Sequence, residues 1–298
     1  MKKITGTFID EITFDIPPQN WGKKEWQREF EIFNEIGIDT AIIIRGGYKR
    51  HSVFPSKIVG DTHTTDLARL FLDAAHKNGV KLYFGIFDTG IFEQGKWDLW
   101  REEVAANQKF IAEVLSRYGD SPAFHGWYIS HETSVFVPGI RDFYHHISNH
   151  MKDVTPEKPV LISPYYSSGV VHAENEMVRN MDEFADEWRN MLGKISSIDI
   201  CAFQDGTCRL EQLPMYMETI KTVCAEAGIE LWNNTETFSR DFPIKFPPTD
   251  YRRLLEKLRI TSPFVEKQIT FEFSHFMSPQ SVWPAARNLF DRYAEALL

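Results

Sequence analysis

Short apolar runs alternate with longer amphipathic segments along the whole chain, and the alternation repeats eight times. Apolar runs rich in β-branched and aromatic residues predict buried strands, and segments with apolar positions every three or four residues predict helices. Strands that alternate with helices indicate parallel βαβ units. The predicted strands are residues 4–9, 40–45, 81–87, 124–130, 160–164, 198–203, 230–234 and 268–273.

The predicted helices follow these strands in turn, over residues 24–36, 66–78, 99–118, 139–152, 181–192, 213–227, 250–258 and 279–296. Gly37, Gly79 and Gly228 stand just before a strand, where a glycine suits the left-handed end of a helix. Eight units without a linker or a break in composition favour one closed (β/α)₈ barrel, with a single domain over residues 1–298. No glycine-rich phosphate motif follows the first strand, which argues against a dinucleotide-binding sheet.

The loops that follow the strands are unequal, whereas the helix-to-strand connections are short. Long loops are expected over residues 11–23, 46–65, 165–179 and 237–249. Long loops gathered on one rim of a barrel mark that rim as the functional face.

Two glutamates, Glu132 and Glu236, end predicted strands four and seven. Strand alternation places Tyr128 and Glu132 on the inner face of strand four, and Trp232, Asn234 and Glu236 on the inner face of strand seven. A carboxylate at the C-terminal end of a barrel strand is typical of a catalytic group, and glycoside hydrolysis requires two. We therefore expect Glu132 and Glu236 to share one pocket, walled by Trp232 and Tyr165.

Three further strand ends carry polar side chains. Glu272 is placed inside strand eight, with Ile269 and Phe271 outside, so that it either pairs with Arg45 at the tip of strand two or binds substrate. Asp205 follows strand six, where it either binds sugar hydroxyls or caps a turn. Asp10 and Asp88 end strands one and three, and for Asp88 a turn is favoured.

Composition narrows the classes of partner. A net charge of −9 and a pI near 5.6 argue against nucleic acid and anionic membrane. Aromatic residues make up 14% of the chain, a surplus that suits a cleft for sugar rings, with stacking walls expected from Trp21, Tyr165, Tyr166 and Trp232.

No membrane span and no signal segment are recognised, so the protein is expected to be cytoplasmic, or exported after loss of such a segment. The three cysteines are expected to be reduced structural thiols.

The motifs around Glu132 and Glu236 resemble the superfamily of retaining glycosidase barrels, in which the acid/base ends strand four and the nucleophile ends strand seven. The sequence Gly126-Trp-Tyr-Ile-Ser-His-Glu132, together with Gln204-Asp205-Gly206, is similar to a bacterial group of glycosidase-like barrels classed as a domain of unknown function. That superfamily usually has asparagine before the acid/base, where it binds the substrate 2-hydroxyl. Here the position is His131, so the role passes to its imidazole, to Asn233 or to Asn234.

Three functions are compatible with this sequence. The leading one is a retaining glycoside hydrolase that acts on a carbohydrate substrate without a cofactor or metal. The second is a metal-dependent sugar isomerase or epimerase, with Glu132, Asp205, Glu236 and His275 as ligands. The third is a carbohydrate-binding barrel that has lost its chemistry.

Overall fold

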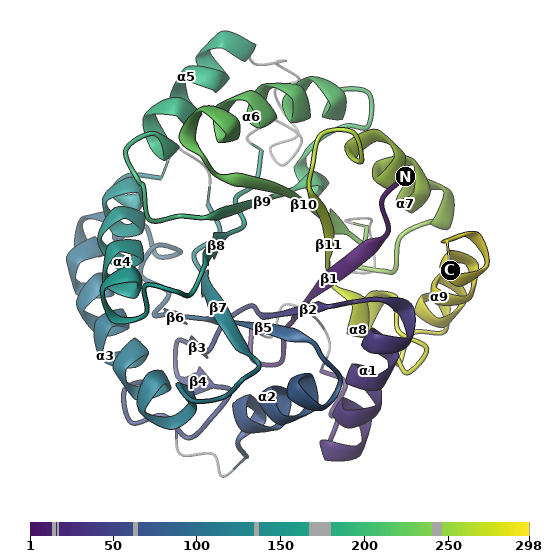
Figure 1. Cartoon of the computed structure of the whole chain (residues 1–298), viewed down its shortest axis with the longest axis horizontal. Helices are drawn as coiled ribbons and strands as arrows, with labels where there is room; N and C mark the ends of the chain where they lie inside the picture. Colours follow the sequence, from purple (N-terminus) through teal and green to yellow (C-terminus); the bar gives the residue numbers. More distant parts are fainter. Residues whose placement is uncertain are drawn as a thin grey trace.

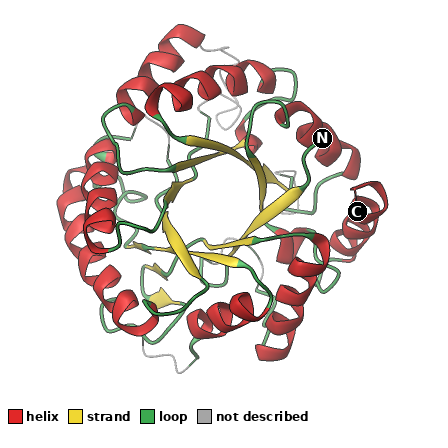
Figure 2. Ribbon diagram, viewed as in Figure 1, coloured by secondary structure: helices red, strands yellow, loops and turns green. Residues whose placement is uncertain are grey.

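Eight parallel strands close into a barrel in this computed structural model, which describes residues 1–13, 16, 18–61, 65–133, 137–166, 180–239 and 246–297. Around the barrel the strands follow the order β1-β11-β10-β9-β8-β7-β5-β2 (Figures 1 and 2). The predicted (β/α)₈ barrel is confirmed. The barrel strands are β1 (Ile4–Ile9), β2 (Thr40–Ile43), β5 (Lys81–Gly85), β7 (Phe124–Ile129), β8 (Val160–Ile162), β9 (Ile200–Gln204), β10 (Glu230–Glu236) and β11 (Lys267–Phe271).

Helices surround the ring of strands (Figure 2). Gly37 and Gly228 end their helices with φ of 82° and 70°, as their sequence positions predict. In the described ranges, no helix is both long and apolar enough to cross a membrane. The long helices are α1 (Lys23–Ile36), α2 (Leu67–Lys77), α3 (Trp100–Tyr118), α4 (Ile140–Val154), α5 (Met181–Leu192), α6 (Leu213–Ala227), α7 (Tyr251–Thr261) and α9 (Pro284–Leu297).

Several short elements differ from the sequence-based expectation. The loop after β2 contains β3 (Gly47–Tyr48) and β4 (His51–Ser52), which form a small sheet with β6 (Phe87–Asp88) in the order β4-β3-β6. The predicted third strand is therefore divided between the barrel and this sheet. Short helices η1 (Trp97–Leu99), η2 (Asp205–Thr207) and α8 (Phe273–Phe276) also occur, and α9 begins later than predicted.

Alternate side chains of each strand pack into two separate apolar layers. Tyr128 and Trp232 lie in the barrel interior, whereas Trp127, Ile129 and Leu231 pack against the helices. The expected faces of β7 and β10 are therefore correct. The interior layer comprises Phe8, Ile42, Ile44, Tyr83, Tyr128, Leu161, Ile200, Ala202, Trp232 and Ile269.

The expected faces of β11 are wrong. Ile269 lies in the barrel interior and Phe271 packs against that interior, whereas Gln268 and Thr270 point toward the helices. Gln268 Nε2 donates to Thr261 Oγ1 on α7 at 2.7 Å, and Thr270 Oγ1 donates to the Thr235 carbonyl at 2.6 Å. The prediction assumed an apolar outer layer, but here the layer between strands and helix is polar and internally hydrogen-bonded, which removes the cost of burying it.

Candidate active site

Glu132 and Glu236 line one cavity of about 150 Å³ at the C-terminal end of the barrel. Glu132 is the third residue after the end of β7, and Glu236 is the last residue of β10. Both polar and apolar side chains line the cavity. Its lining is completed by Asp10, Ile16, Ile44, Arg45, Gln204, Asn234, Phe238, Phe246 and Phe271.

The surroundings of Glu132 favour its protonated form. Burial raises the pKa of Glu132 above its ordinary value, and the nearby Arg45 guanidinium offsets only part of that rise. Tyr128 Oη donates to Glu132 Oε1 at 3.3 Å, and the Gln204 side chain also hydrogen-bonds this carboxyl. A carboxyl group that stays protonated toward neutral pH can act as a general acid.

Glu236 is more deeply buried than Glu132, with 3% of its surface exposed. Its backbone N–H donates to Asp205 Oδ1 at 3.1 Å. Its carboxyl lies directly against the Gly206 backbone, because a Cβ built on Gly206 would be 1.7 Å from Glu236 Oε2. The carboxyl therefore occupies one tightly enclosed position at the cavity wall.

Arg45 supplies a buried positive charge to the cavity. Its Nε donates to Asp88 Oδ2 at 3.2 Å, and its Nη1 donates to Thr13 Oγ1 at 3.2 Å. Asp10, which also lines the cavity, accepts from the Thr13 hydroxyl at 2.6 Å, and burial raises its pKa. The expected pairing of Arg45 with Glu272 is wrong, because Arg45 pairs with Asp88.

Asn234 presents an unused acceptor at the cavity. Its Nδ2 donates to Ser163 Oγ at 3.1 Å, while its buried Oδ1 has no hydrogen-bond partner among the described residues. Buried polar atoms are normally hydrogen-bonded, so this oxygen is suited to accept from a ligand hydroxyl. The neighbouring Asn233 points away from the cavity and donates to Asp205 Oδ2 at 3.3 Å.

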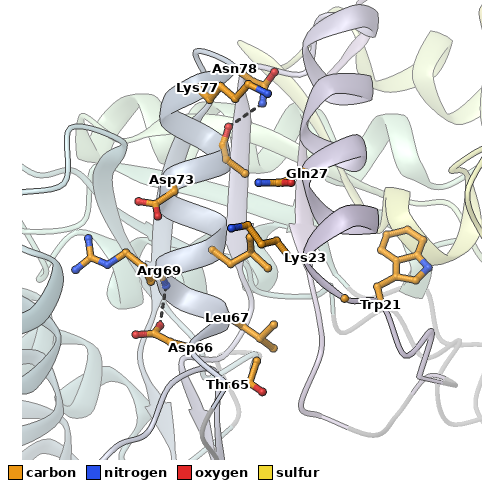
Figure 3. A pocket seen from close by; sticks show the side chains of 13 residues that line it. Trp21, Lys23, Gln27, Thr65, Asp66, Leu67, Arg69, Asp73, Lys77 and Asn78 are labelled. Atoms are coloured by element: carbon orange, nitrogen blue, oxygen red, sulfur yellow. Dashed lines mark hydrogen bonds between the residues drawn. The ribbon is translucent and has the colours of Figure 1, made fainter.

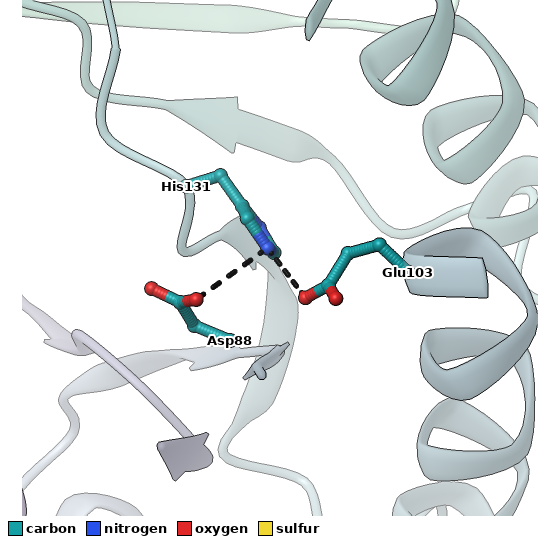
Figure 4. Close-up of side chains that lie close together, drawn as sticks. All are labelled: Asp88, Glu103 and His131. Carbon is teal, nitrogen blue, oxygen red and sulfur yellow. Dashed lines mark hydrogen bonds and ion pairs between the residues drawn. The ribbon is translucent and has the colours of Figure 1, made fainter. Parts of the chain in front are cut away.

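His131 is absent from the lining of the cavity that Glu132 and Glu236 share. It is buried, and its Nε2 lies 2.7 Å from Glu103 Oε1 and 3.8 Å from Asp88 Oδ1 (Figure 4). Burial by itself lowers the pKa of His131, but the carboxylates of Asp88 and Glu103 outweigh it and the net pKa is raised. The expected 2-hydroxyl role of His131 is therefore corrected to an ion-pair role.

The potential ligand atoms of Asp88, Glu103 and His131 lie within 4.8 Å of one another, a spacing that could hold a metal ion. The carboxylates already have partners, however. Arg45 donates to Asp88, and the Thr89 N–H donates to Glu103 Oε1 at 3.0 Å. With the Arg45 cation beside it, and with a His131 whose pKa the two carboxylates raise, the cluster is best described as an ion-pair network.

A second cavity of about 270 Å³ adjoins the first, and Arg45 and Glu132 line both. Tyr165 lies here, as does Trp97, whose surface is 40% exposed. Together the two cavities fall at the lower end of the size range of ordinary small-ligand sites, about 300–1,000 Å³. The rest of this second cavity is lined by Asp88, Phe92, Glu93, His131, Thr133, Val137 and Ile140.

Three of the aromatic side chains expected as stacking walls lie elsewhere. Trp232 is inside the barrel but near the start of β10, where its Nε1 donates to Glu230 Oε1 at 2.6 Å. Tyr166 is buried in the outer core, with its ring stacked 4.7 Å from Phe203. Trp21 lines a groove of about 480 Å³ between α1 and α2 (Figure 3).

Two expected acidic site residues are also excluded from the cavities. Asp205 is fully buried behind β10 and pairs with Lys257 Nζ at 2.7 Å. Glu272 caps α8, accepting the backbone N–H groups of Ser274 and His275, and pairs with the His275 ring. Consequently Glu132, Asp205, Glu236 and His275 do not form the metal-ligand set of the isomerase hypothesis.

The aromatic wall of the first cavity was missed from sequence. Phe238 lies two residues after Glu236, so strand alternation could have found it, and its ring is 4.7 Å from Phe246 and 5.9 Å from Phe271. Phe271 was missed because the faces of β11 were assigned in reverse. Phe246 and Ile16 come from loops and carry no periodic signal.

Comparison with known proteins places this arrangement in a family. Residues 4–283 match the family model described as Domain of unknown function (DUF4434). The chain belongs to this family. Within it, the resemblance to glycosidase-like barrels inferred from the motifs around Glu132 and Glu236 is confirmed at the level of the fold.

One crystal structure is similar over nearly all of this DUF4434 chain. It is a Bacteroides thetaiotaomicron VPI-5482 protein described as a "putative alpha-L-fucosidase", with 38% identity, a TM-score of 0.93, and coverage of 99% of this chain and 95% of that chain. A search of curated proteins finds no match.

More distant solved structures share the fold alone. A Pseudoalteromonas aurantia GH18 chitinase is 10% identical, with a TM-score of 0.58 over 97% of this chain and 100% of that chain. An intracellular xylanase from Thermoanaerobacterium saccharolyticum is 12% identical, with a TM-score of 0.51 over 89% and 84% of the two chains. Both of these proteins are glycoside hydrolases, and what they share with this DUF4434 chain is the barrel fold.

Proposed function

We propose that this protein is a retaining glycoside hydrolase that uses Glu132 and Glu236. The observation that carries the proposal is the cavity lined by both carboxyls, in which burial raises the pKa of Glu132. Two carboxyl groups around one sugar-sized space are the minimum that glycoside hydrolysis requires.

In the first step, the Glu236 carboxylate attacks the anomeric carbon and the bond to the leaving oxygen breaks. The Glu132 carboxyl gives its proton to that oxygen, and a covalent glycosyl-enzyme forms. In the second step, Glu132 takes a proton from water, which attacks the same carbon and releases Glu236. At the end of the second step Glu132 is again protonated and Glu236 is again ionised, and no cofactor takes part.

Substrate contacts follow from the apolar and polar side chains that line the cavity. The apolar face of a pyranose ring would pack on Phe238 and Phe271, and the free Asn234 Oδ1 would accept from a ring hydroxyl. The adjoining cavity beside Trp97 would hold a second ring of the substrate. The proposed substrate is therefore a glycoside with at least two rings, one of them a sugar.

A screen of aryl glycosides with the wild type, Glu132→Ala and Glu236→Ala tests the proposal. α-L-Fucosides belong in the first round because of the description of the 38% identical protein. NMR of the first-formed product decides the stereochemistry, and retention of the anomeric configuration is expected. Inversion would refute the retaining mechanism, and a glycoside that binds without being cleaved would favour the carbohydrate-binding alternative.

A further inference from the structure

Behind β10, on the side away from the cavity, lies a buried ion pair that the two-carboxyl mechanism does not use. Lys257 on α7 and Asp205 at the start of η2 have side chains that are 2% and 0% exposed, and Lys257 Nζ lies 2.7 Å from Asp205 Oδ1. Asn233 Nδ2 donates to the other carboxylate oxygen, Oδ2, at 3.3 Å. A buried ion pair is poor evidence for stability, because removing both charges from water costs about as much as their attraction returns.

This pair binds both backbone polar groups of Glu236. Asp205 Oδ1 accepts the Glu236 N–H at 3.1 Å, and Lys257 Nζ lies within donating distance of the Glu236 carbonyl, at 3.4 Å. Glu236 is the last residue of its strand, where the regular ladder no longer fixes the chain on its own. Side chains from two other elements therefore define the direction in which the Glu236 side chain leaves the backbone.

The residue after Asp205 fixes the carboxyl end of the same side chain. A Cβ on Gly206 would lie 1.7 Å from Glu236 Oε2 and 1.8 Å from its Cδ. Contacts below about 3 Å are not tolerated by real Cβ atoms, so only glycine leaves room for the carboxyl here. Asp205 and Gly206 thus contact the backbone and the carboxyl of Glu236 from one short segment.

We propose that Asp205 and Lys257 are positioning residues that orient the Glu236 carboxylate through its backbone. The catalytic consequence rests on the proposed function, in which Glu236 attacks the anomeric carbon. Attack requires the reacting oxygen within about 3–3.5 Å of that carbon and correctly aligned, and a displacement of about 1 Å can cost roughly 10²-fold in rate. The role of the ion pair is accordingly to hold the Glu236 carboxylate in the position that attack requires.

Asp205→Asn tests the proposal with almost no change in shape. Aspartate uses both oxygens, one for the Glu236 N–H and Lys257 and the other for Asn233, whereas asparagine has a single acceptor oxygen. Asparagine must therefore turn its NH₂ group toward donors, either toward the Glu236 N–H and Lys257 or toward Asn233, and the contacts on that side break. The matched control is Asp61→Asn, the same change at another buried aspartate, which accepts the Ser52 N–H at 2.8 Å and lines neither cavity of the site.

Two readouts are combined, a crystal structure of each variant and the steady-state kinetics. In Asp205→Asn we expect the Glu236 carboxyl to move by about 1 Å and kcat to fall by about 10²-fold with KM nearly constant. Asp61→Asn should leave both unchanged. If Asp205→Asn does not fold, Asp205→Asn combined with Lys257→Met leaves no unpaired charge, and Gly206→Ala displaces the carboxyl with the ion pair intact.

The proposal is overturned if Glu236 keeps its position in these variants, or if kcat falls no further than in Asp61→Asn. An inactive wild type with a displaced Glu236 in Asp205→Asn would refute the hydrolase and support the orienting role. The crystal structures therefore show whether Asp205 and Lys257 position Glu236, independently of whether the protein is a hydrolase.

Discussion

Arg45 Nε donates to Asp88 Oδ2 at 3.2 Å, so the cation that acts on the candidate acid Glu132 is itself held by a second carboxylate. Arg45 lowers the pKa of Glu132 against the larger effect of burial. The protonation state of Glu132 therefore depends on a charge whose place is fixed from the end of β6.

Removing this charge should change the pH dependence of the reaction. Arg45→Met takes away an attraction that favours the ionised form of Glu132, so the pKa of Glu132 rises. The acid then stays protonated to higher pH, and the basic limb of kcat/KM moves toward alkaline pH. The control is Lys49→Met, which removes an exposed lysine from the same loop and should leave the limb in place. A basic limb that moves toward acid would show that another group controls it.

Glu132→Ala and Glu236→Ala should lose activity in different ways. Without the acid, substrates with poor leaving groups should lose about 10²–10⁴-fold in rate, whereas activated aryl glycosides should lose much less. Without the nucleophile, no covalent intermediate forms, and added azide should restore turnover by occupying the space left by the carboxyl. Rates across a series of leaving groups, with and without azide, check both. Equal losses for all leaving groups in Glu132→Ala would remove its acid role.

Trp97 should affect only substrates that reach the second cavity. Trp97→Ala removes its most exposed aromatic ring, and loss of stacking of roughly 1–2 kcal/mol corresponds to about a 5–30-fold fall in kcat/KM. We expect this fall for two-ring substrates and little change for methyl glycosides. Val282→Ala, a change at an exposed apolar residue that lines neither cavity, is the control. The same loss with methyl glycosides would place Trp97 outside the second-ring site.

Glu29 on α1 should make stability depend on pH near neutrality. Burial raises the pKa of Glu29 to about 7, although Ser278 and Gln280 donate to its carboxyl. Since the folded state keeps this proton longer than the unfolded state, its contribution is full below about pH 4.5 and is lost as pH rises through 7. At about 1.4 kcal/mol for each pKa unit, the wild type should lose roughly 3 kcal/mol relative to Glu29→Gln between pH 4.5 and 8.

Urea unfolding of both proteins at several pH values measures this difference. Glu113→Gln is the control, because donation from Ser56 and from two backbone N–H groups outweighs burial and holds the pKa of Glu113 below its ordinary value. Its difference from the wild type should stay constant above pH 5. A constant difference for Glu29→Gln as well would show that Glu29 ionises normally.

Sequence alone located the barrel because its strands are short apolar runs that obey a period of two. For β7 and β10 the alternation also gave the correct inner face, which brought Glu132 and Glu236 to one cavity. The same method failed for β11. Gln268 and Thr270 are buried against polar partners, Thr261 on α7 and Thr235 on β10, so polarity no longer distinguished inside from outside.

The position of a side chain along the barrel axis was harder to predict than whether it points into the barrel or toward the helices. Trp232 and Glu236 share a face of β10, yet only Glu236 lines the cavity. Tyr165 and Tyr166 are adjacent, and one lines the second cavity while the other is core. Such differences depend on where a chain bends after its last strand residue, which periodicity does not record.

The placement of Trp232 also determines from which end of the barrel a ligand can reach the cavity. Its ring packs 6.2 Å from Tyr83, which in turn contacts His125 at 5.4 Å, and both Trp232 and Tyr83 are almost completely buried in the barrel. Among the residues that the structure describes, the barrel is filled below the site, so Glu132 and Glu236 are approached from the rim formed by the strand C-termini. In the proposed hydrolase, the substrate would enter and both cleavage products would leave through that one opening, so a product that stays bound there would block the next turnover.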